Sequence, residues 1–151
     1  MIGAQDIKKL RDLTGLSMSL CKTVLEEAGG DKERALDILR AKGAMAAEKK
    51  SIRTLGAGVI ASYVHNTRNI AAMVELASET DFVSNNEEFR TLAHDIAMHV
   101  SATNPLDLEV LHSEQFIKDP SLTVKDLIQG AVQKFGERVE LVRFIRFAVG
   151  E

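Results

Sequence analysis

The stretch that decides the fold is VIASYVHNTRNIAAMVELA, residues 59–77. Two runs rich in Val, Ile and Ala flank the polar segment HNTRN, residues 65–69, and this pattern is typical of an antiparallel β-hairpin. A third run, VELVRFIRFAV at residues 139–149, is rich in β-branched and aromatic residues and predicts another strand. We therefore expect an antiparallel sheet of three strands.

Two amphipathic helices are expected to accompany this sheet. The first runs from about Asn85 to Ser101 and carries one stripe of apolar residues at helical spacing. The second begins at Ser121 or Thr123 and carries a similar stripe. Residues 106–121 show no clear period and are expected to be irregular. Strands and helices together predict an α+β core over residues 55–151.

Residues 1–54 predict a separate three-helix module followed by a linker. Three short segments with helical apolar spacing follow one another, and Gly29 and Gly30 end the second. Gly43 is expected to end the third helix. The Ala- and Lys-rich residues 44–54 are then expected to form a helical or mobile connector.

Composition is typical of a cytoplasmic protein. Hydrophobic residues make up 45% of the 151 residues, but no apolar run reaches the roughly 18 residues that a membrane span needs. The N-terminal sequence MIGAQDIKKL lacks the apolar region of a secretory signal. Cys21 is the only cysteine and fits a reducing compartment. The net charge of −3 argues against direct nucleic-acid binding.

No catalytic or metal site is expected. Cys21 lies on the apolar stripe of a predicted helix, which indicates a buried structural thiol. His94 and His99 are five residues apart, so they point about 140° apart around a helix and cannot share a metal ion. The GAG sequence at residues 56–58 lacks the Lys and Ser/Thr of a phosphate loop. We expect a protein that acts by binding, without enzyme activity or cofactor.

The polar segment SETDFVSNNEEF, residues 78–89, joins the hairpin to the first core helix and contains one puzzling aromatic residue. A continued helical phase would place Phe82 on the same buried face as Phe89, seven residues later. If one of the polar residues that follow caps the helix, Phe82 instead lies outside it, beside Asp81. Sheet and helix could then hold Phe82 outward as an interface anchor.

Three segments, in this order, resemble the elongation factor Ts family. IKKLRDLTGLSMSLCKTVLEEAGGDKERALDILRAKG at residues 7–43 resembles the family's N-terminal ubiquitin-associated-like module. ASETDFVSNNEEF at residues 77–89 is similar to its most recognisable motif, and RFIRFAVGE at residues 143–151 resembles its last core strand. The sequence LSMSL at residues 16–20 departs from the AGMMD that the family often has there.

The resemblance implies a guanine-nucleotide exchange factor that binds elongation factor Tu·GDP and disturbs the magnesium and phosphate end of the nucleotide site. By this resemblance, the residues that bind Tu are Thr80, Asp81, Phe82 and Val83. Asp81 and Phe82 would intrude between helices of the Tu GTPase domain. A second expected contact consists of Thr14, Gly15 and Leu16.

The N-terminal module leaves one other function open. Ubiquitin-associated domains have the same three-helix plan, so the chain could be a ubiquitin-binding adaptor without exchange activity. The match to the TDFV motif at residues 80–83 argues against that alternative.

All three strands carry apolar residues on both faces, so the sheet is expected to need cover on both sides. Strict alternation gives one face with Met73, Val142, Phe144 and Ala148, and one with Val74, Leu141, Ile145 and Phe147. The two amphipathic helices can cover one face. Either a homodimer covers the other by pairing it with itself, or residues 106–121 fold back over it. The homodimer is preferred, and it makes residues 55–151 an exchange and dimerisation domain.

Overall fold

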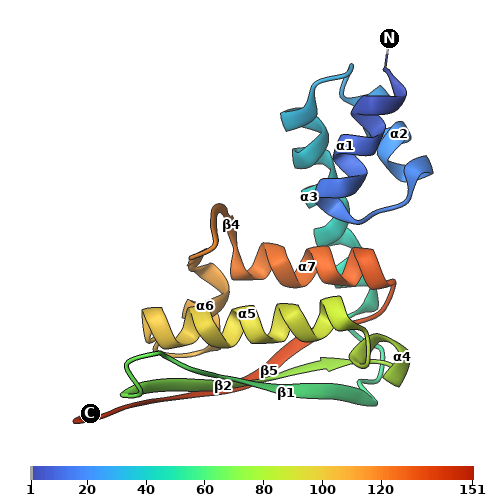
Figure 1. Ribbon diagram of the computed structural model, residues 1–151. Coiled ribbons are helices and arrows are strands. Elements are labelled where there is room, and N and C mark those ends of the chain that lie inside the picture. The colour runs from blue at the N-terminus through green and yellow to red at the C-terminus, as the bar shows by residue number, and fades with distance from the viewer. Residues whose placement is uncertain (1) are drawn as a thin grey trace.

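The computed structural model describes residues 2–151. Three helices form the N-terminal end of the chain, and the remainder forms a core in which helices lie over a three-stranded sheet (Figure 1). The predicted α+β class is confirmed. None of the helices in the described residues is long and apolar enough to cross a membrane.

The N-terminal helices are α1 (Ala4–Thr14), α2 (Met18–Glu27) and α3 (Lys32–Lys50). Ser17 and Asp31 begin α2 and α3, because their side-chain oxygens accept hydrogen bonds from free N–H groups of the first turn. The helices enclose a core of their own, formed by Leu10, Leu16, Cys21, Val24, Leu25, Ala28, Ala35 and Leu39.

The third helix does not end at Gly43, as the sequence predicts, but continues to Lys50. Gly43 lies where α3 packs against α7 (Val124–Phe135). A Cβ atom on Gly43 would lie 3.3 Å from Oε1 of Gln133 and 3.4 Å from the backbone oxygen of Gln129. The glycine therefore permits two helices to approach closely. Of the two alternatives for the connector, helical or mobile, the helical one is correct as far as Lys50, where α3 ends.

The sheet consists of β1 (Ala57–Val64), β2 (Ile70–Ser78) and β5 (Glu140–Ala148), antiparallel and in the order β1-β2-β5. Both the hairpin and the third strand are confirmed. The hairpin closes through the N–H of His65, which donates to the carbonyl of Ile70 at 2.9 Å.

One face of this sheet is covered by α5 (Glu87–Thr103), which contacts all three strands. Figure 1 shows α7 on the far side of α5, and its main contacts are with α3. Phe89 and Phe135 join the two core helices edge to face, with ring centroids 5.9 Å apart. Of the two amphipathic helices that the sequence predicts as cover, α5 lies directly on the sheet and α7 forms a further layer.

Residues 106–121 are not irregular. They contain α6 (Leu108–Ser113), β3 (Gln115–Phe116) and most of β4 (Asp119–Thr123). These elements are too short to leave a periodic signal in the sequence. They lie on the helical side of the sheet and contact α5 and α7, so they do not fold back over its second face (Figure 1). That alternative is wrong.

A β-bulge decides which side chains of β5 share a face. Glu75 pairs with Arg143 and Leu76 with Leu141, which leaves Val142 without a partner on β2. An extra residue reverses the alternation of side chains along a strand. The register also pairs Met73 with Ile145 and Val74 with Phe144. Because of the register and the bulge together, neither of the two face sets predicted from strict alternation is correct.

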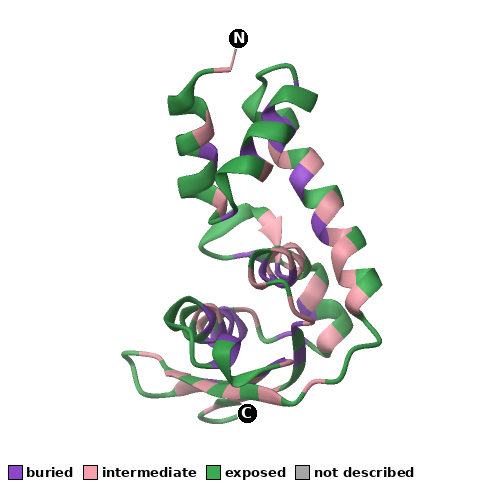
Figure 2. Cartoon of the chain, turned by 90° about the vertical axis from the view of Figure 1, so that its right-hand side faces the viewer, coloured by how far each residue is buried: buried purple, intermediate pink, exposed green. Residues whose placement is uncertain are grey.

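The second face of the sheet, here called the open face, is exposed and largely apolar. Its apolar residues are Ile60, Val64, Ala71, Met73, Ile145 and Phe147, and the same register places Ser62, Glu75 and Arg143 on it. Val64 is 64% and Phe147 is 65% exposed. Figure 2 shows buried segments in the helices and in the sheet below them, together with parts of the sheet that are coloured intermediate and exposed. The expectation that two helices leave one apolar face uncovered is confirmed.

Candidate functional site

The polar segment after β2 contains a single helical turn, α4 (Asp81–Ser84). Phe82 is 91% exposed, whereas Val83 is 7% exposed and packs in the core. Consecutive residues of a helix point about 100° apart, so these neighbours face different environments. Asn86 caps α5 and interrupts the helical phase between Phe82 and Phe89. The interpretation of Phe82 as a core residue is wrong.

A carboxylate from a distant turn holds the backbone just before α4. Glu137 follows Gly136, whose left-handed backbone (φ 71°) ends α7. Oε1 of Glu137 accepts hydrogen bonds from the N–H groups of Glu79 (3.1 Å) and Thr80 (3.0 Å), and Oε2 accepts one from the Thr80 hydroxyl (2.6 Å). The turn between β2 and α4 is thereby fixed to the turn between α7 and β5.

Glu79 reinforces this connection in the opposite direction. Its carboxylate accepts a hydrogen bond from the N–H of Arg138 and forms an ion pair with Arg53, with 3.6 Å between nitrogen and oxygen. The guanidinium of Arg138 also donates to the carbonyl of Arg53 at 2.7 Å. The chain after α3, the end of β2 and the start of β5 therefore meet beside α4.

The N-terminal part of α5 supports α4 from its other end. Arg90 donates from Nε to the carbonyl of Ser84 (3.3 Å) and from Nη2 to the side-chain oxygen of Asn85 (3.0 Å). The hydroxyl of Ser78 donates to the carbonyl of Thr80 at 3.0 Å. Both ends of α4 are therefore fixed to neighbouring elements.

This arrangement suits binding rather than bond making. Phe82 is a large apolar side chain in water, and the exposed Asp81 lies next to it in the first turn of α4. Burying a Phe side chain against a partner contributes roughly 1.5–3 kcal/mol. A side chain on a fixed support also loses less conformational freedom on binding than one on a mobile loop.

The second expected contact, at the end of α1, is largely structural. Leu16 is 8% exposed and belongs to the N-terminal core. The Thr14 hydroxyl donates to the carbonyl of Leu10 at 2.8 Å, and Gly15 ends α1 with a left-handed backbone (φ 70°). The exposed apolar residue of this segment is Leu13, at 60%. Sequence reasoning missed it, because its spacing matches the buried face of α1.

A cavity of about 400 Å³ is lined by residues of this segment, of α3 and of α7. Its apolar lining includes Leu13, Leu16, Leu36, Leu39, Leu127 and Phe135. Lys134 also lines it, forms an ion pair with Glu88, and has its pKa lowered from the usual value by burial. Arg40 similarly pairs with Asp126 at 3.9 Å. In each of these two ion pairs, the positive and the negative charge neutralise each other.

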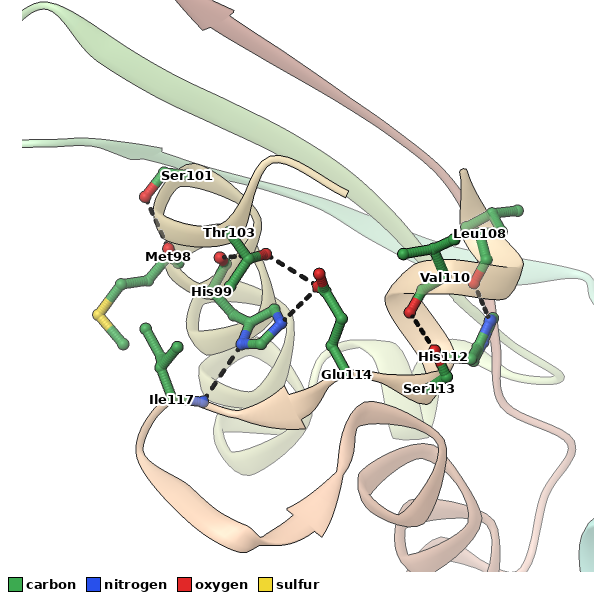
Figure 3. A network of polar contacts seen from close by, with 10 residues as sticks. All are labelled: Met98, His99, Ser101, Thr103, Leu108, Val110, His112, Ser113, Glu114 and Ile117. Carbon is green, nitrogen blue, oxygen red and sulfur yellow. Dashed lines mark hydrogen bonds and ion pairs between the residues drawn. The ribbon is translucent and has the colours of Figure 1, made fainter. Parts of the chain in front are cut away.

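The buried histidine has a structural role. Nδ1 of His99 accepts the N–H of Ile117 (3.2 Å), so the proton of the neutral ring is on Nε2, which donates to Glu114 at 3.0 Å (Figure 3). The hydroxyl of Thr103 donates to the same Glu114 oxygen. These bonds fix the β3–β4 hairpin to α5. Within residues 2–151, no three His, Cys, Asp or Glu side chains gather as candidate metal ligands.

Comparisons with known proteins agree with the motif that begins α4. A family model described as "Elongation factor TS" matches residues 32–108 and 79–151. Elongation factor Ts of Thermodesulfovibrio yellowstonii is 40% identical over 194 aligned residues, covering 99% of this chain and 97% of that protein. Elongation factor Ts of Thermosipho melanesiensis is 36% identical over 196 residues, covering 100% of both chains.

Relatives of a different length match as well. Elongation factor Ts of Clostridium kluyveri is 40% identical over 151 residues, which cover 100% of this chain but 49% of that protein. The alignment with the Thermosipho melanesiensis protein extends over 196 residues, whereas this chain has 151, so about 45 aligned positions have no counterpart here. This chain is therefore shorter than both of these relatives.

Proposed function

Because the chain belongs to the elongation factor Ts family and is therefore a translation elongation factor, we propose that it acts as the guanine-nucleotide exchange factor of elongation factor Tu. In this proposal it binds Tu·GDP and disturbs the magnesium and phosphate end of the nucleotide site. The observation that carries the proposal is a 91% exposed Phe82 on a helical turn fixed at both ends. The reaction takes place in the cytoplasm and requires no cofactor or catalytic residue of this chain.

We divide the motif into residues that contact Tu and residues that support them. Asp81 and Phe82 are exposed and are proposed to insert between helices of the Tu GTPase domain. Val83 anchors α4 in the core, and Thr80 donates hydrogen bonds to the carboxylate of Glu137. Support residues still affect Tu binding, since they set the direction of the contact pair.

Linkage explains how binding alone can release a nucleotide. If this protein weakens the affinity of Tu for GDP by some factor, GDP weakens the affinity of Tu for this protein by the same factor. Each tenfold change corresponds to about 1.4 kcal/mol. The roughly 1.5–3 kcal/mol from burying Phe82 therefore accounts for one or two factors of ten. Any further weakening of GDP binding is assigned to the rest of the interface with Tu and to loss of magnesium.

The N-terminal module is proposed to add affinity rather than exchange activity. The exposed Leu13 and its neighbour Thr14 are the available contacts at the end of α1, since Leu16 is buried and Gly15 has no side chain. Residues 1–54 are thus assigned to binding, and residues 55–151 to exchange and dimerisation.

The open face is proposed to pair with itself in a homodimer. Met73 and Ile145 lie side by side at its centre, each 45% exposed, and monomers avoid large exposed apolar patches. The ion pair between Glu75 and Arg143, with 2.8 Å between nitrogen and oxygen, leaves no unbalanced charge at the next register position. A two-fold axis would bring identical apolar faces together.

The experiment that tests the exchange proposal follows fluorescent GDP as it leaves purified Tu. Addition of this protein in excess is expected to accelerate release by about tenfold or more, since each factor of ten needs only about 1.4 kcal/mol of coupling. An unchanged release rate at every concentration reached would contradict the proposal. Bovine serum albumin at the same concentration serves as the control.

A further inference from the structure

We propose that Glu137 is a positioning residue for the exchange site: its carboxylate sets the direction in which α4 presents Asp81 and Phe82. This inference rests on the proposed function. Glu137 is separated from Thr80 by 57 positions in the sequence, and it makes three hydrogen bonds to the two residues that precede α4. Hydrogen bonds to a charged carboxylate are about twice as strong as bonds between neutral groups.

The reason that α4 needs such a partner lies in its length. It has four residues, and helices this short are not stable by themselves. Thr80 occupies the N-cap position but makes no side-chain capping bond to α4. Its hydroxyl donates to Glu137 instead, at 2.6 Å. The peptide from which Asp81 and Phe82 continue is therefore oriented by Glu137.

A reciprocal bond locks the two turns together. Glu137 accepts the N–H of Glu79, and the carboxylate of Glu79 accepts the N–H of Arg138. Each turn thus supplies one carboxylate to the backbone of the other. Arg53 balances part of the negative charge through its ion pair with Glu79. The bonds restrain both translation and rotation of the segment before α4.

The first part of the test uses the isolated full-length chain and needs no partner. Glu137→Ala removes the carboxylate that accepts the N–H groups of Glu79 and Thr80. Amide hydrogen exchange at these two residues is therefore expected to become about tenfold or more faster. Glu140→Ala is the matched control, since that carboxylate pairs with the Arg138 side chain and makes no bond to Glu79 or Thr80. Unchanged amide exchange in Glu137→Ala would overturn the inference.

The second part distinguishes positioning from general stability by measuring GDP release from Tu at saturating protein. Glu137→Ala is expected to lower the maximum rate by about tenfold, while Glu137→Gln retains at least about half of it, because the amide oxygen can still accept both N–H groups. In a Phe82→Ala background, Glu137→Ala is expected to lower the rate by clearly less than about tenfold, because only the positioning of Asp81 remains to be lost and groups that act through each other are not additive.

Fully additive effects of Glu137→Ala and Phe82→Ala would overturn the inference, as would a Glu137→Ala maximum rate equal to that of the wild type. Circular dichroism of each variant controls for folding. If the wild-type chain itself fails to accelerate release, the proposed exchange function is contradicted, and the amide-exchange comparison still decides whether Glu137 positions α4.

Discussion

Phe82 and Val83 are adjacent in the sequence, yet one is 91% and the other 7% exposed. The sequence motif identifies the pair, and the polar residues after it indicate that the helical phase is broken before Phe89. Glu137 could not be found in the same way. It lies more than fifty positions away, and only the folded chain brings it to the N–H groups of Glu79 and Thr80.

Because one residue of this pair is buried and the other exposed, their substitutions are expected to differ in how much they lower stability. Val83→Ala is expected to lower the free energy of unfolding by roughly 1–3 kcal/mol, because it leaves a cavity in the core. Phe82→Ala is expected to change it by less than about 0.5 kcal/mol, since exposed substitutions rarely do more. Urea unfolding followed by circular dichroism measures both, and a larger loss from Phe82→Ala than from Val83→Ala would contradict the assignment.

At the scale of elements, sequence periodicity and capping residues predict most helices and strands. They do not predict elements that are short or distorted. The hairpin, α5 and α7 carry long regular patterns and clear caps at Asn86 and Thr123. By contrast, α6 and the β3–β4 hairpin are too short to show a period, and the bulge at Val142 depends on pairing with β2. Gly43 looks like a helix end in the sequence, but its role depends on the helix packed against it.

Two glycines test this packing between helices. Gly43→Leu is expected to destabilise the chain by roughly 1–3 kcal/mol, because a Cβ there already meets the Gln129 carbonyl of α7 at 3.4 Å. Gly130→Ala on α7 is the matched control, since nothing lies within 4 Å of its added Cβ. It is expected to stabilise by up to about 1 kcal/mol through better helix propensity. Thermal unfolding of both variants measures these changes in stability. Equal changes in the two variants would contradict the close approach of α3 and α7.

At the scale of the whole molecule, the open face is the surface on which the proposed dimer depends. The apolar composition of all three strands predicts the uncovered face, but strict alternation does not predict which side chains of β5 lie on it. Residues 57–148 form a layered core in which one face of the three-stranded sheet is left free. That face is the surface that a second copy of the chain is proposed to cover.

Light scattering at low micromolar concentration tests the dimer. The mass is expected to be twice the 16.6 kDa of one chain, and Met73→Glu is expected to halve it by placing a charge in the apolar interface. Leu106→Glu is the control, because Leu106 is 87% exposed but lies outside the sheet. A wild-type mass of 16.6 kDa across the dilution range would contradict the dimer.

Phe82 is the residue on which the proposed exchange activity depends most directly. Stopped-flow release of fluorescent GDP from Tu, with the wild-type chain and Phe82→Ala each at saturation, measures that dependence. The expected result is a maximum rate about tenfold or more lower for Phe82→Ala, which corresponds to about 1.4 kcal/mol of lost coupling or more. Equal maximum rates from two equally folded proteins would contradict the role of Phe82 as the wedge.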